Sequence, residues 1–182
     1  ALDGPRDSTE LRRARELRPF IEAADFLLDL HSMLEPSPPV MICGPLDKGI
    51  RFAFDVAIPK DIVSDEGHAN GTRMRDYAGF GDPGSPKNAL LVECGQHWER
   101  AAEHVAWQTT WRFLRHLDVV DRETATREIA AEAPAPQRLV RVTEAPRQFV
   151  MHGGDAGRPV GRDLLADRQA QPQVQERVRL PG

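Results

Sequence analysis

The chain has 182 residues, which is enough for one domain or for one domain and part of a second. Hydrophobic residues make up 40% of it and charged residues 29%, so we expect a soluble protein with a core. The formal net charge of -4 and the pI of about 5.9 argue against nucleic acid and membranes as partners, because nucleic acids and anionic membranes select basic surfaces.

The two cysteines, Cys43 and Cys94, lie in apolar segments typical of strands. We expect them to be free thiols in a reducing compartment, which predicts a cytoplasmic protein. Neither has a histidine beside it in the sequence, so a thiol nucleophile is not favoured. No apolar run reaches the length of a membrane span, and no signal peptide is recognisable. Because the first residue is Ala1 and not Met, we expect a longer parent protein.

The N-terminal segment predicts two short helices. Asp7 and Glu10 have the spacing of a capping box, with Asp7 as the N-cap. Pro19 is incompatible with a helix interior, so we expect a break near Arg18 and a second helix over residues 19–24.

The elements that follow alternate between strands and helices, as in an α/β protein. The apolar run from Phe26 to Leu30 predicts a strand that is covered on both faces. The next predicted elements are a strand over 40–43, a helix over 47–56, a glycine-rich loop over 59–87, a strand over 89–95, a helix over 96–119, and short strands over 138–143 and 148–152.

Composition divides the chain into three regions. Residues 1–129 predict an α/β domain, and residues 130–137, which include two prolines, predict a linker. Residues 138–182 predict a small region that is β-rich or partly disordered, because the tail from Gly153 has no aromatic residue.

Two predicted strands carry polar residues near their carboxyl ends. Side chains alternate along a strand, so Asp29 and His31 share one face. His31 is either a core histidine bonded to a backbone carbonyl, or a metal ligand or base supported by Asp29. Glu93 is either a structural carboxylate paired with an arginine or an acid–base group. If both strands belong to one sheet, His31 and Glu93 meet in one cleft that suits amide hydrolysis.

Other candidate residues have weaker support. Arg73 and Arg75 are either solvated loop charges or an arginine fork for a substrate carboxylate. His97 and His104 lack a third ligand and are predicted to lie at the surface or against a helix. The tryptophans are predicted to be packing residues; they are Trp98, Trp107 and Trp111.

Three segments, in this order, resemble the succinylglutamate desuccinylase/aspartoacylase family of zinc carboxypeptidase-like hydrolases. They are LLDLHSM at residues 27–33, GHANGTR at 67–73 and LVECGQHW at 91–98. The resemblance covers about residues 8–117. It implies a three-layer α/β/α sandwich around a mixed sheet, incomplete at the N-terminus, with a short β-rich C-terminal region.

The resemblance also implies a function. The family hydrolyses the amide bond of N-acyl amino acids or similar linear amides, with zinc as cofactor and a small molecule as substrate. It implies that His31 is one of three zinc ligands, that Glu93 activates the attacking water, and that Arg73 grips the substrate carboxylate. The other two ligands come from an upstream His-x-x-Glu motif, which this sequence lacks. We therefore expect the C-terminal portion of a longer enzyme, inactive alone, with a sheet edge exposed.

Two alternatives stay open. One is a metal-free binding module of the same fold that holds an acidic small molecule, and the absent motif favours it. The other is a zinc carboxypeptidase that cleaves peptides, which would need a wider cleft. The sequence leaves open which acyl group and amino acid are recognised, and whether the protein is a homo-oligomer.

Overall fold

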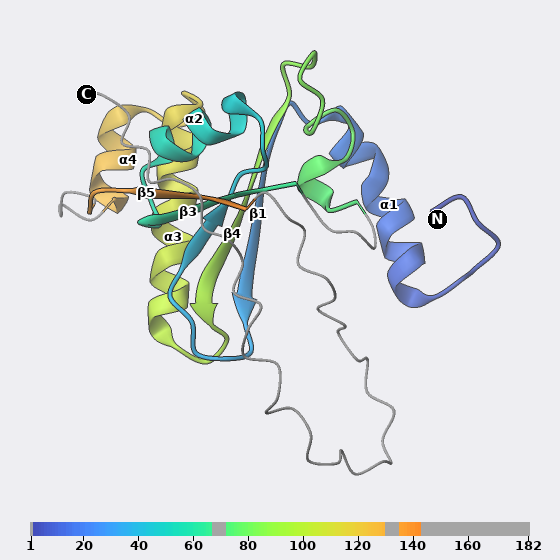
Figure 1. Ribbon diagram of the computed structural model, residues 1–182, viewed down its shortest axis with the longest axis horizontal. Helices are drawn as coiled ribbons and strands as arrows, with labels where there is room; N and C mark the ends of the chain where they lie inside the picture. The colour runs from blue at the N-terminus through green and yellow to red at the C-terminus, as the bar shows by residue number, and fades with distance from the viewer. Residues whose placement is uncertain (1, 67–71, 130–134, 143–182) are drawn as a thin grey trace, which may run out of the picture.

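The computed structural model describes residues 2–66, 72–129 and 135–142. These residues form an α/β fold around one mixed sheet, with strands in the order β1-β4-β2-β3-β5 (Figure 1). β1 is parallel to β4, β2 is antiparallel to β4, and β3 is parallel to both β2 and β5. The mixed sheet confirms the predicted fold class. The strands are β1 (Phe26–Met33), β2 (Val40–Ile42), β3 (Asp61–Asp65), β4 (Asn88–Gln96) and β5 (Arg138–Val142).

Helices lie on both sides of this sheet. α2 (Asp47–Val56), α3 (Arg100–His116) and α4 (Arg122–Glu128) are on one side, and α1 (Thr9–Ala23) is on the other (Figure 1). The short 3-10 helix η1 (Met74–Asp76) is also in contact with β4 and β1. None of the described helices combines the length and the apolar character that crossing a bilayer requires.

The core lies between the sheet and the helices α2 and α3. Alternate residues of β4 point into it, because side chains along a strand alternate between the two faces. Leu90, Val92 and Cys94 are all buried there. Their main partners in the core are Met41, Ile50, Phe52, Ala53, Val56, Ile62, Ala102, Phe113 and Leu139.

A β-bulge interrupts the pairing of β1 with β4 near their carboxyl ends. His31 pairs with Glu93 and Met33 pairs with Gln96, so Ser32 faces two residues, Cys94 and Gly95. Gly95 has φ +119°, a left-handed conformation that glycine adopts without steric cost. The bulge lets β4 continue past the residue at which the sequence predicted its end.

The predicted break in the first helix is wrong. α1 is continuous, with Pro19 inside it. Pro19 leaves the carbonyl of Arg15 without its helical donor, but α1 has no buried residue, so water can serve that carbonyl. The N-cap is Ser8, whose Oγ accepts a hydrogen bond from the backbone N–H of Leu11.

Three other element predictions also need correction. The predicted loop over 59–87 contains β3, in which buried Ile62 and Ser64 alternate with less buried neighbours. α3 begins at Arg100 and not at residue 96, because β4 extends to Gln96. α4 was not predicted, although the side chain of its N-cap, Asp121, accepts a hydrogen bond from the Thr124 N–H. The predictions for residues 67–71 and 143–182, including the strand over 148–152, lie outside the described residues.

The prediction that β1 is covered on both faces is wrong, because none of its residues is buried. β1 is also an edge strand in the described part of the chain. β4 is its neighbour on one side, and no described strand pairs with the other. Phe26 and Leu30 are each 42% exposed as a result. An exposed edge is the feature expected from the resemblance, in which further strands belong to this sheet.

Candidate active site

His31 and Glu93 are register partners on adjacent parallel strands, so their side chains leave the sheet side by side on one face. Nδ1 of His31 lies 3.9 Å from Oε1 of Glu93. This distance is longer than a hydrogen bond, so the two groups border a common space without binding each other directly. The structure thus brings together the two residues that the sequence singled out.

Asp29 orients the imidazole of His31. Its Oδ1 lies 3.0 Å from Nε2 of His31. An ionised carboxylate only accepts hydrogen bonds, so Nε2 is the donor in this contact. In the neutral tautomer that the contact favours, the lone pair of Nδ1 is on the side of Glu93. The interpretation of His31 as a core histidine bonded to a carbonyl is wrong, because its side chain is 47% exposed and its partner is Asp29.

Glu93 carries an unpaired oxygen. Its Oε2 is buried and has no hydrogen-bond partner among the residues that the structure describes. An unpaired buried acceptor destabilises a protein by about 1–3 kcal/mol. The alternative interpretation, a structural ion pair with an arginine, is not found in the described ranges. An unpaired carboxylate beside an oriented imidazole is the chemistry that proton transfer requires.

An open groove of about 500 Å³ lies at the carboxyl ends of β1 and β4, and His31 lines it but Glu93 does not. Its volume is within the range of small-molecule sites. His31, His97 and Trp98 line it together with the first turns of α3. Trp98 is 84% exposed, so its predicted role as a packing residue is wrong. Trp107, which is 51% exposed, also departs from that prediction.

Ser32 and His97 form a contact that the sequence did not predict. The hydroxyl of Ser32 and Nδ1 of His97 share a hydrogen bond of 2.7 Å. His97 is at the surface, as expected, but it is tied to β1. Alternation alone could not have shown this contact, because a spacing of four residues would put His97 on the same face as Glu93.

Arg73 and Arg75 are held elsewhere, by Asp65 at the carboxyl end of β3. Nη1 of Arg73 donates to both Asp65 oxygens, at 2.9 and 2.7 Å, and Nη2 of Arg75 donates to Oδ1 at 2.5 Å. Their side chains are 16% and 2% exposed, so the interpretation as solvated loop charges is wrong. Whether Arg73 grips a substrate carboxylate stays a prediction.

The strand register separates this arginine cluster from His31 and Glu93. Glu93 is level with Val40 on β2, and Val40 is level with Asp61 on β3. Asp65 lies four residues further along β3, which corresponds to roughly 13 Å along the strand. The structure therefore does not bring Arg73 to the His31–Glu93 pair.

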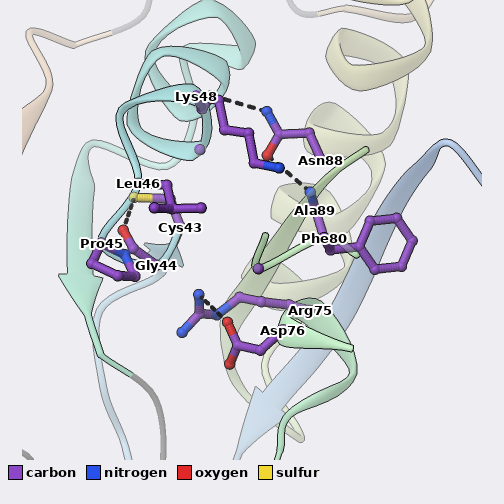
Figure 2. A pocket seen from close by; sticks show the side chains of 12 residues that line it. Cys43, Gly44, Pro45, Leu46, Lys48, Arg75, Asp76, Phe80, Asn88 and Ala89 are labelled. Atoms are coloured by element: carbon purple, nitrogen blue, oxygen red, sulfur yellow. Dashed lines mark hydrogen bonds and ion pairs between the residues drawn. The ribbon is translucent and has the colours of Figure 1, made fainter. Parts of the chain in front are cut away.

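A second cavity, of about 20 Å³, adjoins Arg75 and is far too small for a substrate. Figure 2 shows the guanidinium of Arg75 pointing toward Gly44, with Asp76 beside it. Gly44 has φ +67°, and a Cβ there would lie within 2.2 Å of Arg75 Nη1.

Lys48 Nζ binds the carbonyl oxygens of three residues on the facing segment, Asp82, Ser85 and Lys87. The Lys48 bonds fix the segment that follows η1 against the first turn of α2.

Both cysteines are free and buried, which agrees with the predicted reduced state. Burial raises the pKa of the Cys43 thiol to about 12. Burial, with a smaller effect of the nearby Glu93 charge, raises the pKa of Cys94 to about 11. Neither thiol is a nucleophile near neutral pH.

Among the described residues, His31 could serve as one ligand of a zinc ion. Nδ1 of His31 is an available imidazole donor, and the carboxylate behind its other nitrogen matches the usual surroundings of a metal-binding histidine. Catalytic zinc needs three protein ligands, however. Within residues 2–66, 72–129 and 135–142, no group of three or more His, Cys, Asp or Glu could hold a metal ion. Two further donors would have to come from outside these ranges.

Solved structures share this fold. A succinylglutamate desuccinylase/aspartoacylase from Rhodobacter sphaeroides matches 78% of this chain and 43% of its own length, with 19% identity and a TM-score of 0.57. The ectoine utilization protein EutE (DoeB) from Ruegeria pomeroyi matches 78% of this chain and 44% of its own, with 15% identity and a TM-score of 0.52. The resemblance deduced from the sequence is thus confirmed at the level of the fold, and the chain spans less than half the length of these proteins.

No protein-family model matches the sequence, and no curated protein matches it either.

Proposed function

We propose that His31 and Glu93 belong to the active site of a zinc-dependent hydrolase that cleaves the amide bond of an N-acyl amino acid or a similar linear amide. One observation carries the proposal: the imidazole that Asp29 orients presents its free nitrogen 3.9 Å from a carboxylate with an unpaired oxygen. The fold shared with a succinylglutamate desuccinylase/aspartoacylase supports it.

The side chains of this protein would take the following roles in the reaction. Glu93 accepts a proton from the attacking water as the water oxygen bonds to the amide carbon. As the carbon–nitrogen bond breaks, Glu93 returns that proton to the leaving nitrogen, giving an amine and a carboxylic acid, which then releases its own proton to the amine or to solvent. Asp29 holds His31 in the tautomer that offers Nδ1 to a metal. Zinc, when bound, would supply a Lewis acid that polarises the scissile carbonyl.

The rest of the site belongs to the proposal as well. Two zinc ligands are to be provided by polypeptide outside the described residues, and the chain without them is inactive. His31 borders a groove of about 500 Å³, a volume within the range of small-molecule sites. A cytoplasmic location is supported by the two buried free thiols.

The first experiment reads the coding sequence upstream of Ala1 for a His-x-x-Glu pair, and then measures hydrolysis of a panel of N-acyl amino acids by the zinc-loaded full-length protein. Glu93→Gln should lower kcat by at least about 100-fold, since general acid–base catalysis contributes that much. Glu123→Gln is the matched control, because Glu123 is exposed on α4. Zinc-loaded wild type that cleaves none of the panel would refute the hydrolase. Wild-type activity in Glu93→Gln would refute the role of Glu93.

The second candidate function is a metal-free binding module for an acidic small molecule. It is favoured by one observation, that the described residues contain no three-ligand metal group. Calorimetry with N-succinyl glutamate, in the presence and absence of a chelator, separates the two. Binding that the chelator leaves unchanged, with no turnover, is the result expected of the module and not of the enzyme.

A further inference from the structure

We propose that the hydrogen bond between Ser32 and His97 is a positioning device that holds His31 against Glu93. The inference rests on the proposed function, which it extends by two residues. Neither side chain is assigned a contact with the reacting atoms.

β1 needs such a device because it is an edge strand. His31 stands two residues before its end at Met33, and the structure describes a strand partner on one side only. Strand ends with one neighbour open more easily than central strands. A catalytic pair, in contrast, must keep its geometry to within about 0.5 Å. The spacing of His31 and Glu93 therefore depends on the contacts that hold the last residues of β1 against β4.

The β-bulge makes the hydrogen bond between Ser32 and His97 possible. Without it, His97 would share the face of Glu93, because the two are four residues apart on one strand. The extra residue at Cys94–Gly95 shifts the alternation by one, which turns His97 to the other face. Ser32 is on that face because it neighbours His31. The bulge thus places the imidazole of His97 next to Ser32, the residue that directly follows His31.

Three hydrogen bonds then close this end of the strand pair. The backbone N–H of His97 donates to the carbonyl of Met33 at 2.9 Å. The side-chain amide of Gln96 donates to the carbonyl of Leu34 at 3.3 Å. The Ser32–His97 bond, at 2.7 Å, is the shortest of the three and the nearest to His31 in sequence. It is also made wholly by side chains, so mutation can remove it without altering the backbone.

Paired variants test the proposal. Ser32→Ala and His97→Phe remove the bond, whereas Ser32→Thr keeps a hydroxyl and His97→Asn keeps a polar group near the position of Nδ1. His104→Phe is the control, because His104 is an exposed histidine on α3 outside the contact. In the zinc-loaded full-length protein, the two disruptive variants should lower kcat about 10-fold with KM within about twofold, since supporting contacts around a metal site have effects of this size. Ser32→Thr should keep kcat at the wild-type value, because it retains the hydroxyl.

A second measurement does not depend on activity. Nitrogen-15 spectra of the histidine rings report the tautomer of His31, and hydrogen exchange reports the opening of β1 over residues 30–33. Both should change in Ser32→Ala and His97→Phe, and both should match the wild type in Ser32→Thr and His104→Phe. Unchanged ring spectra and exchange would overturn the proposal, as would wild-type kcat in both disruptive variants. If the wild type hydrolyses nothing, the proposed function fails, and these spectra still decide whether the contact positions His31.

Discussion

The imidazole of His31 and the carboxylate of Glu93 face each other from neighbouring parallel strands, with 3.9 Å between Nδ1 and Oε1. In the neutral tautomer that the contact with Asp29 favours, with the proton on Nε2, both atoms hold an electron pair. Two acceptors that border one space favour a cation or a proton donor between them. This preference is why we propose that the pair is a site and not a structural contact.

Replacing Glu93 should separate stability from activity. Glu93→Gln removes a charge whose Oε2 is buried without a partner in the described part of the chain. We expect the free energy of unfolding to stay the same or to rise by about 1 kcal/mol, because the cost of burying an unpaired carboxylate disappears. Urea unfolding measures this, and a loss of more than about 1 kcal/mol would contradict it.

Asp29→Ala should remove the preference of the His31 ring for one tautomer. With no acceptor for Nε2–H, the proton will distribute over both ring nitrogens, and signals of the Nδ1–H form should appear in nitrogen-15 spectra. Zinc affinity of the full-length protein should fall about 10- to 100-fold. Asp29→Asn retains an acceptor oxygen and should lose less. A single Nε2–H form in Asp29→Ala would show that something other than Asp29 orients the ring.

Gly49→Ala should destabilise the protein, although alanine normally favours a helix over glycine. Gly49 lies in α2, and a Cβ there would stand 2.3 Å from the carbonyl oxygen of Cys43. Because that atom belongs to the backbone, we expect a loss of about 1–3 kcal/mol, as for other overpacked sites. Gly84→Ala is the control, because the nearest atom to its Cβ would be Oδ1 of Asp82 at 3.4 Å. Equal thermal midpoints for the two variants would contradict the prediction.

The two thiols should make the fold less stable at alkaline pH. Burial raises the pKa of Cys94 from its ordinary 9.0 to about 11. Between these values the unfolded thiol ionises and the native one does not, so ionisation lowers the free energy of the unfolded state and the stability of the fold falls as the pH rises. Cys43 acts in the same direction, with a pKa of about 12. Below pH 9 neither thiol contributes.

Urea unfolding at pH 8, 9, 10 and 11 measures this effect. The wild type should lose on the order of 5 kcal/mol more across this range than Cys43→Ala/Cys94→Ala does, because each thiol contributes about 1.4 kcal/mol for each pH unit between its unfolded and native pKa. Parallel curves for the two proteins would mean that other groups cause the alkaline loss.

The sequence was most informative where one residue pattern has one structural solution. The run over 89–94 had to be a buried strand, and β4 is indeed the one on which Leu90 and Val92 have no exposure. The alternation that puts Asp29 beside His31 is likewise a local property of strands, and the structure pairs them. Glu93 could be placed opposite His31 because both stand at the same end of strands in one sheet.

The features that escaped prediction depend on contacts between distant residues. β3 is short and its Asp61 and Asp65 have low strand propensity, yet pairing with β2 and β5 on either side fixes it. Arg73 and Arg75 looked solvated because their partner, Asp65, lies on that unpredicted strand. The contact between Ser32 and His97 needs the bulge at Gly95, and a bulge cannot be deduced from alternation alone.

β5 has a consequence for any attempt to shorten the chain. It pairs with β3 over five positions, its Leu139 is 3% exposed, and Gln137 donates to the carbonyl of Pro59. Truncation after Ile129 would therefore remove the strand that pairs with one side of β3, and it would expose the core next to Ile62. Val142 is the earliest endpoint at which a shortened polypeptide keeps this layer of the sheet intact.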